Sequence, residues 1–284
     1  MAELYTPLRR PLLGLLWFAT AMASGPAAAL ATEPAPVGVD GNWKLVFSDE
    51  FDAPLSPEKW TRCYWWDDNG CTNLGNEELQ WYMPDNVIVS DGKLILRAKK
   101  ESVPGHEGKT YDYTSGMVTS GRGYGERPEP DRFATTYGYF EIRAKVPAGK
   151  GLWSAFWLLP STHKSKPEID VMEVLGHAPD ILEMHVHYRD DDGESQGPGS
   201  ETKVQDMSED FHVIGVDWQR DAIVWYFDGV EQWRYTVEET ISKEPMYILL
   251  NLAVGGVWPG APDEGTVFPA DYVIDYVRVW KRQD

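Results

Sequence analysis

Apolar and polar residues alternate in short runs along most of the chain, and none of these runs has a long 3.6-residue apolar period. Such alternation is typical of β-strands that bury one face. The runs that carry the pattern are Trp43–Ser48, Asn86–Ser90, Lys93–Lys99, Gly138–Val146, Trp153–Leu159, Glu168–Leu175, Ile181–His187, Phe211–Trp218, Ala222–Phe227, Val230–Thr236, Met246–Ala253 and Tyr272–Trp280. About a dozen strands favour an all-β fold of two packed sheets.

Two tight turns join pairs of these runs. Asp91-Gly92 and Asp228-Gly229 each lie between two strand-like segments, and an Asp-Gly pair in that position favours a type I′ hairpin. Residues 100–135 and Asp190–Lys203 are rich in glycine, proline and charge. We expect both to be long surface loops, of a length that often shapes a binding site.

The N-terminus resembles an export signal. Two arginines precede an apolar run over Leu12–Ala23, which is too short to span a bilayer, and a plausible A-x-A cleavage site ends at Ala31. A buried N-terminal helix is the alternative, which interrupting proline and glycine residues disfavour. We therefore expect residues 1–31 to be a secretory signal peptide and residues 32–284 to be a single domain in an extracellular or periplasmic protein.

Charge and cysteine content narrow the function classes. The formal charge is −19, and removal of residues 1–31, with two arginines and one glutamate, makes it −20. This disfavours nucleic acid and anionic membrane surfaces as partners.

Cys63 and Cys71 are the chain's two cysteines, and export predicts a disulfide between them, with two free thiols as the alternative. A zinc site is disfavoured because no second cysteine pair or histidine cluster shares the segment.

The most informative segment is Glu168–Glu173, with the sequence EIDVME. It places three acids in a run that otherwise suits a buried strand. In a regular strand Glu168 and Asp170 share a face, while Glu173 points the other way. A β-bulge near Val171 or Met172 would return Glu173 to the face of Glu168.

Two glutamates on one strand face suggest glycoside hydrolysis. With the bulge their Cα atoms would be roughly 13 Å apart, at 3.3 Å per residue, and sheet curvature could bring the long side chains closer. Retaining glycosidases hold two carboxyl groups about 5–5.5 Å apart, one as nucleophile and one as acid/base. Asp170 adds a charge that would help keep a neighbour protonated. The alternative is a solvated strand face with scattered acids.

Aromatic residues just upstream support a sugar site. Trp153 and Trp157 have equal parity in the strand and flank the small Ala155, and aromatic faces suit the apolar faces of sugar rings. One of the two could equally be a core residue, and Trp157 is the one we expect in the core.

These residues together resemble glycoside hydrolase family sixteen, the retaining endo-β-glucanases that include laminarinases and lichenases. The acidic segment is similar to the family's bulged E-x-D-x-x-E motif and follows a G-x-W-x-A-x-W-x-x-P run as expected. Further similar segments are Asn76–Tyr82, Tyr113–Gly116, Tyr137–Lys145, Asn251–Gly260 and Asp275–Trp280. The resemblance covers nearly all of residues 32–284.

The resemblance implies a curved β-jelly-roll of two antiparallel sheets with a concave substrate cleft. It implies Glu168 as nucleophile, Asp170 as its assistant and Glu173 as acid/base. The residues that it places along the cleft are Trp153, His187, Asn76, Trp258 and Asn251.

The chain departs from the family's sequence pattern at two positions, and the same resemblance suggests one metal site. Met117 stands where members often carry Arg, and Glu77 stands where many carry Asn. Some members hold a structural calcium ion, which would map to Glu50 and Asp275, although both could be ordinary surface acids. Catalysis itself requires no cofactor in this family.

Two rival functions are weighed against hydrolysis. His185-Val186-His187 followed by Asp191 faintly resembles the metal-binding strand of cupins, which would require His185 in the site. A jelly-roll could also be a carbohydrate-binding module without catalysis, but such a module needs no pair of glutamates. We expect a monomeric endo-β-glycosidase that hydrolyses β-1,3-glucan or mixed β-1,3/1,4-glucan. The sequence leaves open a related exopolysaccharide such as succinoglycan as the substrate. It also leaves open transglycosylation as the reaction.

Overall fold

The computed structural model describes residues 1–3, 33–65, 71–105, 108–123 and 130–283. Pro34–Asp284 is one compact unit and Met1–Glu33 is a separate one. The export signal expected at residues 1–31 lies almost wholly outside the described residues. Within the described part of the chain, no helix has the length and apolar character needed to cross a membrane.

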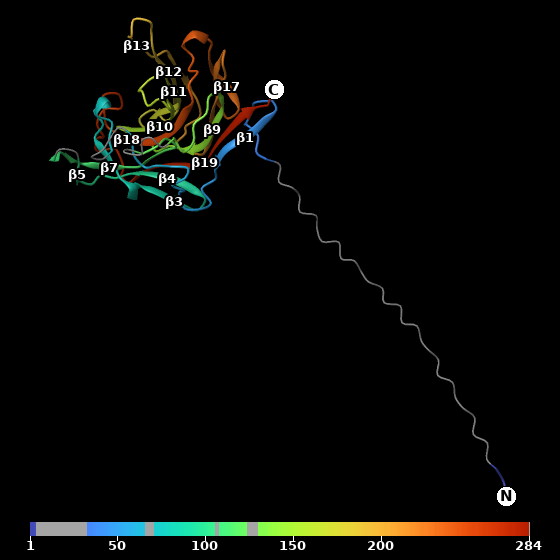
Figure 1. Ribbon diagram of the computed structural model, residues 1–284. Helices are drawn as coiled ribbons and strands as arrows, with labels where there is room; N and C mark the ends of the chain where they lie inside the picture. The colour runs from blue at the N-terminus through green and yellow to red at the C-terminus, as the bar shows by residue number, and fades with distance from the viewer. Residues whose placement is uncertain (4–32, 66–70, 106–107, 124–129, 284) are drawn as a thin grey trace. The chain divides into compact units, whose positions relative to one another are not determined.

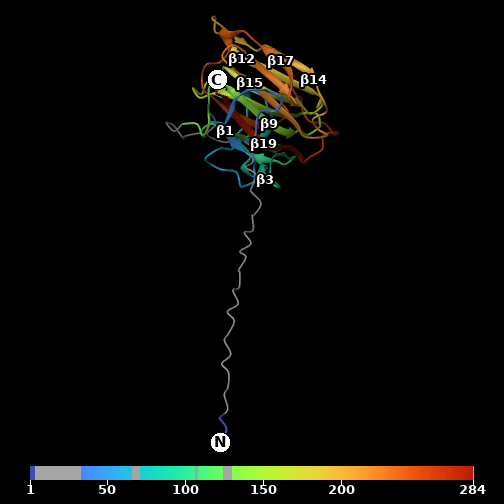
Figure 2. The ribbon, with the colours of Figure 1, turned by 90° about the vertical axis from the view of Figure 1, so that its right-hand side faces the viewer.

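The larger sheet has eight antiparallel strands in the order β17-β16-β15-β9-β19-β4-β3, with β1 also paired to β19 (Figures 1 and 2). Its strands are β1 (Trp43–Asp49), β3 (Val87–Ser90), β4 (Lys93–Ala98), β9 (Gly138–Lys145), β15 (His212–Trp218), β16 (Ile223–Phe227), β17 (Val230–Tyr235) and β19 (Ala270–Arg282).

The second sheet has seven strands in the order β13-β12-β11-β10-β18-β8, with β14 paired to β12. Its strands are β8 (Met117–Thr119), β10 (Leu152–Pro160), β11 (Glu168–Leu175), β12 (Ile181–Arg189), β13 (Ser195–Gln196), β14 (Gly199–Lys203) and β18 (Met246–Val254). Two further pairs, β2 (Gln80–Tyr82) with β7 (Tyr113–Ser115) and β5 (Val103–Pro104) with β6 (Thr110–Tyr111), complete the strands. The expected all-β sandwich of two antiparallel sheets is confirmed.

One hydrophobic core fills the space between the two sheets. Every second residue of β4 is buried, as the alternating sequence predicts, and β18, which lies between β10 and β8, is buried at all nine positions. Trp218 and Trp225 are fully buried in this core. Burial of each large apolar side chain stabilises the fold by about 1.5–3 kcal/mol.

Both predicted hairpin turns are present. Asp91 and Gly92 have φ angles of 52° and 68°, and Asp228 and Gly229 have 47° and 78°. Positive φ at both central residues defines the type I′ turn, so the Asp-Gly pairs specify the connections β3–β4 and β16–β17.

The two expected surface loops are only partly loops. Within residues 100–135, Thr114–Ser120 are buried and include β8, an edge strand of the seven-stranded sheet. Within Asp190–Lys203, β13 and β14 pair with β12. Both predictions were wrong in this respect because edge strands with one solvated face carry polar residues and lack a strong apolar signal.

The two cysteines are joined, as the sequence predicts, in a disulfide with Cα atoms 5.5 Å apart. Cys71 is buried beside Met117, with Sγ and Sδ 3.6 Å apart. The disulfide therefore closes the loop between residues 63 and 71 and lies against Met117 of strand β8.

Removal of the disulfide should destabilise the protein. Closing a loop between residues eight positions apart is worth about 2.5 kcal/mol in the chain-entropy model. Replacing both cysteines with serine should lower the free energy of unfolding by about that amount in a urea titration. A variant as stable as the parent, or two thiols that alkylate without reductant, would contradict the pairing.

Candidate active site

A cleft of about 690 Å³ lies over the seven-stranded sheet. Strands β10, β11, β12 and β18 contribute most of its floor, and a short 3₁₀ helix, η1 (Leu74–Asn76), stands at its edge. Its described lining residues are Tyr64, Trp65, Asn73, Asn76, Glu78, Trp153, Ala155, Trp157, Leu159, Lys164, Ser165, Lys166, Glu168, Asp170, Glu173, His185, His187, Asn251 and Trp258. All eight site residues expected at or beside the substrate are among them.

A β-bulge in β11 brings the three acids to one face. The pairing with β10 runs from Met172 directly to Asp170, so Val171 has no partner there. The pairing with β12 is also shifted between Asp170 and Glu173. Trp225, from the opposite sheet, donates its indole N–H to the Asp170 carbonyl oxygen at 2.9 Å. The bulge expected near Val171 is present, and it turns Glu173 into the cleft.

Burial raises the pKa of Asp170 and of Glu168, two of the three acids of the motif. The Asp170 side chain is 2% exposed, and its burial, followed by repulsion from Glu173, raises its pKa well above the ordinary value. Burial, followed by repulsion from Asp170, likewise raises the pKa of Glu168. The site therefore holds protons that the same groups would release in water.

Two histidines of β12 contact the acids diagonally. His187 Nε2 lies 3.0 Å from Asp170 Oδ2, and His185 Nδ1 lies 3.1 Å from Glu173 Oε2. Burial would lower the pKa of His185, but the contact with Glu173 outweighs it and raises the pKa. Burial lowers the pKa of His187. The imidazole beside Asp170 is thus less basic than an ordinary histidine, and the one beside Glu173 is more basic.

Tryptophans form an aromatic platform at the acids. Trp153 donates its indole N–H to Glu173 Oε1 at 3.1 Å, and its ring meets that of Trp258 edge to face with centroids 5.2 Å apart. Trp258 is 41% exposed. Trp157, expected in the core, instead lines the cleft and donates to Asn251 Oδ1 at 2.8 Å. That prediction was wrong because the alternation of β10 is unbroken along its pairing with β18, so Trp157 shares the cleft face with Trp153.

A buried acid that sequence reasoning missed organises one side of the cleft. Glu78 is 3% exposed and accepts hydrogen bonds from Asn76 Nδ2 at 2.9 Å and Gln80 Nε2 at 2.6 Å. Tyr82 donates to Glu78 at 3.4 Å and accepts from Asn251 Nδ2 at 3.1 Å. Burial raises the pKa of Glu78. The adjacent pair Glu77-Glu78 gave no signal, since only the fold separates an exposed acid from a buried one.

The two departures from the family pattern lie away from the acids. Met117 is fully buried beneath the disulfide, and Glu77 is exposed in a left-handed conformation at the end of η1. Neither residue is among those that line the cleft.

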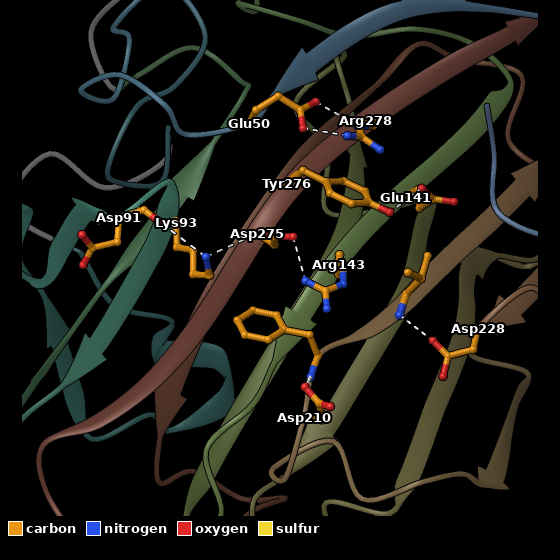
Figure 3. Close-up of polar contacts among 12 residues, drawn as sticks. Glu50, Asp91, Lys93, Glu141, Arg143, Asp210, Asp228, Asp275, Tyr276 and Arg278 are labelled. Atoms are coloured by element: carbon orange, nitrogen blue, oxygen red, sulfur yellow. Dashed lines mark hydrogen bonds and ion pairs between the residues drawn. The ribbon is translucent and has the colours of Figure 1, made fainter. Parts of the chain in front are cut away.

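The proposed calcium ligands have other partners. Glu50 forms a two-pronged ion pair with Arg278, at 2.8 and 2.7 Å, and Asp275 contacts Arg143 at 2.8 Å and Lys93 at 3.5 Å (Figure 3). Calcium needs six to eight oxygen ligands, whereas both carboxylates here face cations. Their arrangement does not fit a calcium site.

The positions of His185 and His187 bear on the rival interpretation of a cupin-like metal protein. His185 does line the cleft, contrary to the expectation that only His187 would. The acid near both histidines is, however, Asp170 of the catalytic motif, while Asp191 is exposed. The fold thus does not bring Asp191 to the two histidines, as the cupin interpretation required.

Comparison with known proteins decides the family. The model of glycosyl hydrolases family 16 matches residues 75–278. The chain belongs to this family. It is 36% identical over 267 residues to a beta-glucanase of Rhodothermus marinus, covering 84% of this chain and 86% of that protein. It is also 39% identical over 249 residues to an endo-1,3-1,4-beta-glycanase of Rhizobium meliloti, of which it spans about half, 51%.

Solved structures agree with the family assignment. The laminarinase catalytic domain of Thermotoga maritima superposes with a TM-score of 0.74 and 35% identity, covering 86% of this chain and all of that one. The laminarinase of Rhodothermus marinus has a TM-score of 0.71 and 33% identity, covering 86% of this chain and 99% of that one. Both the jelly-roll fold and the family are thus established for residues that include the entire acidic motif.

The raised pKa of Glu168 predicts a pH-dependent gain in stability on substitution. Below the ordinary glutamate pKa of about 4.3, this carboxyl is protonated in both the folded and the unfolded chain. As the pH rises above that value, the unfolded chain releases the proton at a lower pH than the folded protein does, so folding loses stability. Glu168→Gln, which does not titrate, should leave the free energy of unfolding nearly unchanged at pH 4 and raise it at pH 7.

Urea titrations at the two pH values measure the difference. The exposed Glu58 offers a matched control, because Glu58→Gln removes the same charge without removing a buried acid. An equal gain for both variants at pH 7 would attribute the effect to net charge and contradict the prediction.

Proposed function

We propose that this protein is a retaining endo-β-glucanase that hydrolyses β-1,3-glucan or mixed β-1,3/1,4-glucan. One observation carries the proposal: the bulged strand places Glu168, Asp170 and Glu173 on the floor of a cleft lined with tryptophans. The names of the relatives, a beta-glucanase, an endo-1,3-1,4-beta-glycanase and laminarinases, support glucan as the substrate class.

In the proposed mechanism, Glu168 attacks the anomeric carbon while Glu173 protonates the leaving glycosidic oxygen. Water then enters, Glu173 removes its proton, and the glycosyl–Glu168 bond is hydrolysed with net retention. Both roles need opposite protonation states at the start. Glu173 contacts His185 and accepts the indole N–H of Trp153, and these contacts position its carboxyl group in the cleft.

Asp170 is the residue that allows Glu168 to be ionised. Burial and repulsion from Glu173 raise its own pKa, and it shares a hydrogen bond with Glu168, so we propose that Asp170 is the acid of the pair that carries the proton when Glu168 is ionised. A protonated Asp170 donates to the Glu168 carboxylate, which places negative charge on the nucleophile. The buried environment of Asp170 thus serves the chemistry of its neighbour.

The tryptophans supply sugar subsites next to the reacting bond. Trp153 and Trp258 meet edge to face beside Glu173, and the Trp157–Asn251 pair lies on the adjacent strands. Apolar ring faces and fixed amide groups suit an uncharged glucan chain. We include secretion, based on the export signal expected at residues 1–31, and action as a monomer in this proposal.

The two glutamates should fail differently when removed. Glu168→Ala leaves space in which azide can attack directly and give an α-glycosyl azide. Glu173→Ala still forms the covalent intermediate from substrates with good leaving groups, and azide then gives a β-glycosyl azide. NMR of the adducts reports the configuration.

Glu183→Ala is the control, because this acid pairs with Glu173 across the strands but does not line the cleft. It should retain most of the activity and give no azide adduct. Exchanged configurations would reverse the two roles, and near-normal activity of Glu168→Ala or Glu173→Ala on polysaccharide would refute the site.

Uncharged glucans should be cleaved faster than sulfated chains. A formal charge of −19 repels polyanions, and the cleft floor itself holds three acids. Release of reducing ends from laminarin and lichenan should exceed release from carrageenan or keratan sulfate by more than about tenfold at low salt. Binding without release of reducing ends would favour the rival carbohydrate-binding module, and faster cleavage of a sulfated chain would overturn the substrate class.

A further inference from the structure

We propose that the cleft also holds one divalent transition-metal ion on Asp170, His185 and His187, and that this ion inhibits the enzyme. An oxygen of Asp170 and one ring nitrogen of each histidine lie within 4.8 Å of one another. Ligand atoms about 2.0–2.2 Å from a common metal are separated by up to about 4.4 Å, so a small side-chain movement completes the site.

Asp170 has the atom that such an ion would use. Its Oδ2 is buried, has no hydrogen-bond partner among the described residues, and faces the ring nitrogen of His187 at 3.0 Å. An unsatisfied buried carboxylate oxygen is costly. A metal ion would supply the missing partner for this atom.

Two glycines behind the histidines fix which edge of each ring faces the acids. A Cβ added to Gly197 would lie 2.7 Å from His187 Nδ1, and one added to Gly199 would lie 2.6 Å from His185 Nε2. Each ring therefore rests its outer edge on a glycine that has no room for a side chain. His187 Nε2 and His185 Nδ1 are the edges that face the acids, where they contact Asp170 and Glu173.

Two imidazoles and one carboxylate select the class of metal. Imidazole suits Zn²⁺, Cu²⁺, Ni²⁺ and Co²⁺, whereas Ca²⁺ and Mg²⁺ prefer oxygen ligands alone. The three ligands come from adjacent strands and face an open cleft, so water or a sugar hydroxyl could complete the coordination. The ligand set is thus that of an exchangeable site.

Inhibition, unlike metal binding itself, rests on the proposed function. A metal on His185 Nδ1 would replace its contact with Glu173, and a metal on Asp170 would engage the carboxyl group that lies between the two glutamates in the motif. The residues beside both catalytic glutamates would thus be held by the ion. The ion would also occupy space next to the scissile bond.

Cobalt titration of the untagged full chain, stripped with EDTA and desalted, tests the binding. We expect one Co²⁺ per chain with visible ligand-field absorption, and an affinity that falls by more than about tenfold in both His187→Asn and Asp170→Asn. His177→Asn, which removes an exposed histidine outside the cluster, should bind like the parent. Circular dichroism verifies that each variant is folded.

Activity measurements separate this inference from the proposed function. Laminarin hydrolysis should proceed in EDTA, fall on addition of Zn²⁺ and return with excess EDTA. No visible Co²⁺ spectrum, or equal loss of affinity in His177→Asn, would overturn the metal site while leaving the glucanase proposal intact. Metal binding with no hydrolysis of any glucan in EDTA would instead refute the proposed function.

Discussion

The chemistry of this fold depends on a single extra residue in strand β11. Without the bulge at Val171, the side chain of Glu173 would point between the sheets, where an unpaired carboxylate costs several kcal/mol. The bulge is fastened from the opposite sheet, because the fully buried Trp225 gives its indole hydrogen to the carbonyl oxygen of Asp170. This hydrogen bond therefore connects the core to the active site. The register of β11 determines which acids reach the cleft.

Bringing three acids together costs free energy of folding, and contacts with the surrounding residues offset part of this cost. Burial and mutual repulsion raise the pKa of Glu168 and of Asp170, so folding holds these groups in an environment that disfavours their charged forms. The two histidines and Trp153 return part of that cost through direct contacts. The proposed reaction needs a nucleophile and an acid that differ in protonation at one pH, so it depends on the different surroundings of these carboxyl groups.

The sequence was most informative where one face of a strand is buried and least informative where tertiary pairing decides. Alternation predicted the long strands, and parity alone required a bulge in Glu168–Glu173. Strands β13 and β14 escaped notice because both faces of these edge strands are largely polar. The calcium hypothesis failed for a similar reason, since Glu50 and Arg278 are 228 residues apart in sequence and only the β1–β19 pairing brings them together.

Glu78, inside the cleft, is another residue whose role depends on tertiary contacts that the sequence does not reveal. Its surroundings indicate what shapes the sugar subsites. Two segments far apart in sequence form one wall: Leu79 donates to the carbonyl of Val254 at 2.8 Å, and Val257 donates to the carbonyl of Asn76 at 3.0 Å. Gly256, with a φ of 119°, approaches the Asn76 carbonyl so closely that a Cβ would lie 2.8 Å from it. Trp258 is thus an exposed side chain on a backbone tied to the segment that Glu78 organises. Its ring can be fixed against Trp153 without being buried, because the buried acid and the backbone bonds, not the ring itself, supply the rigidity of the wall.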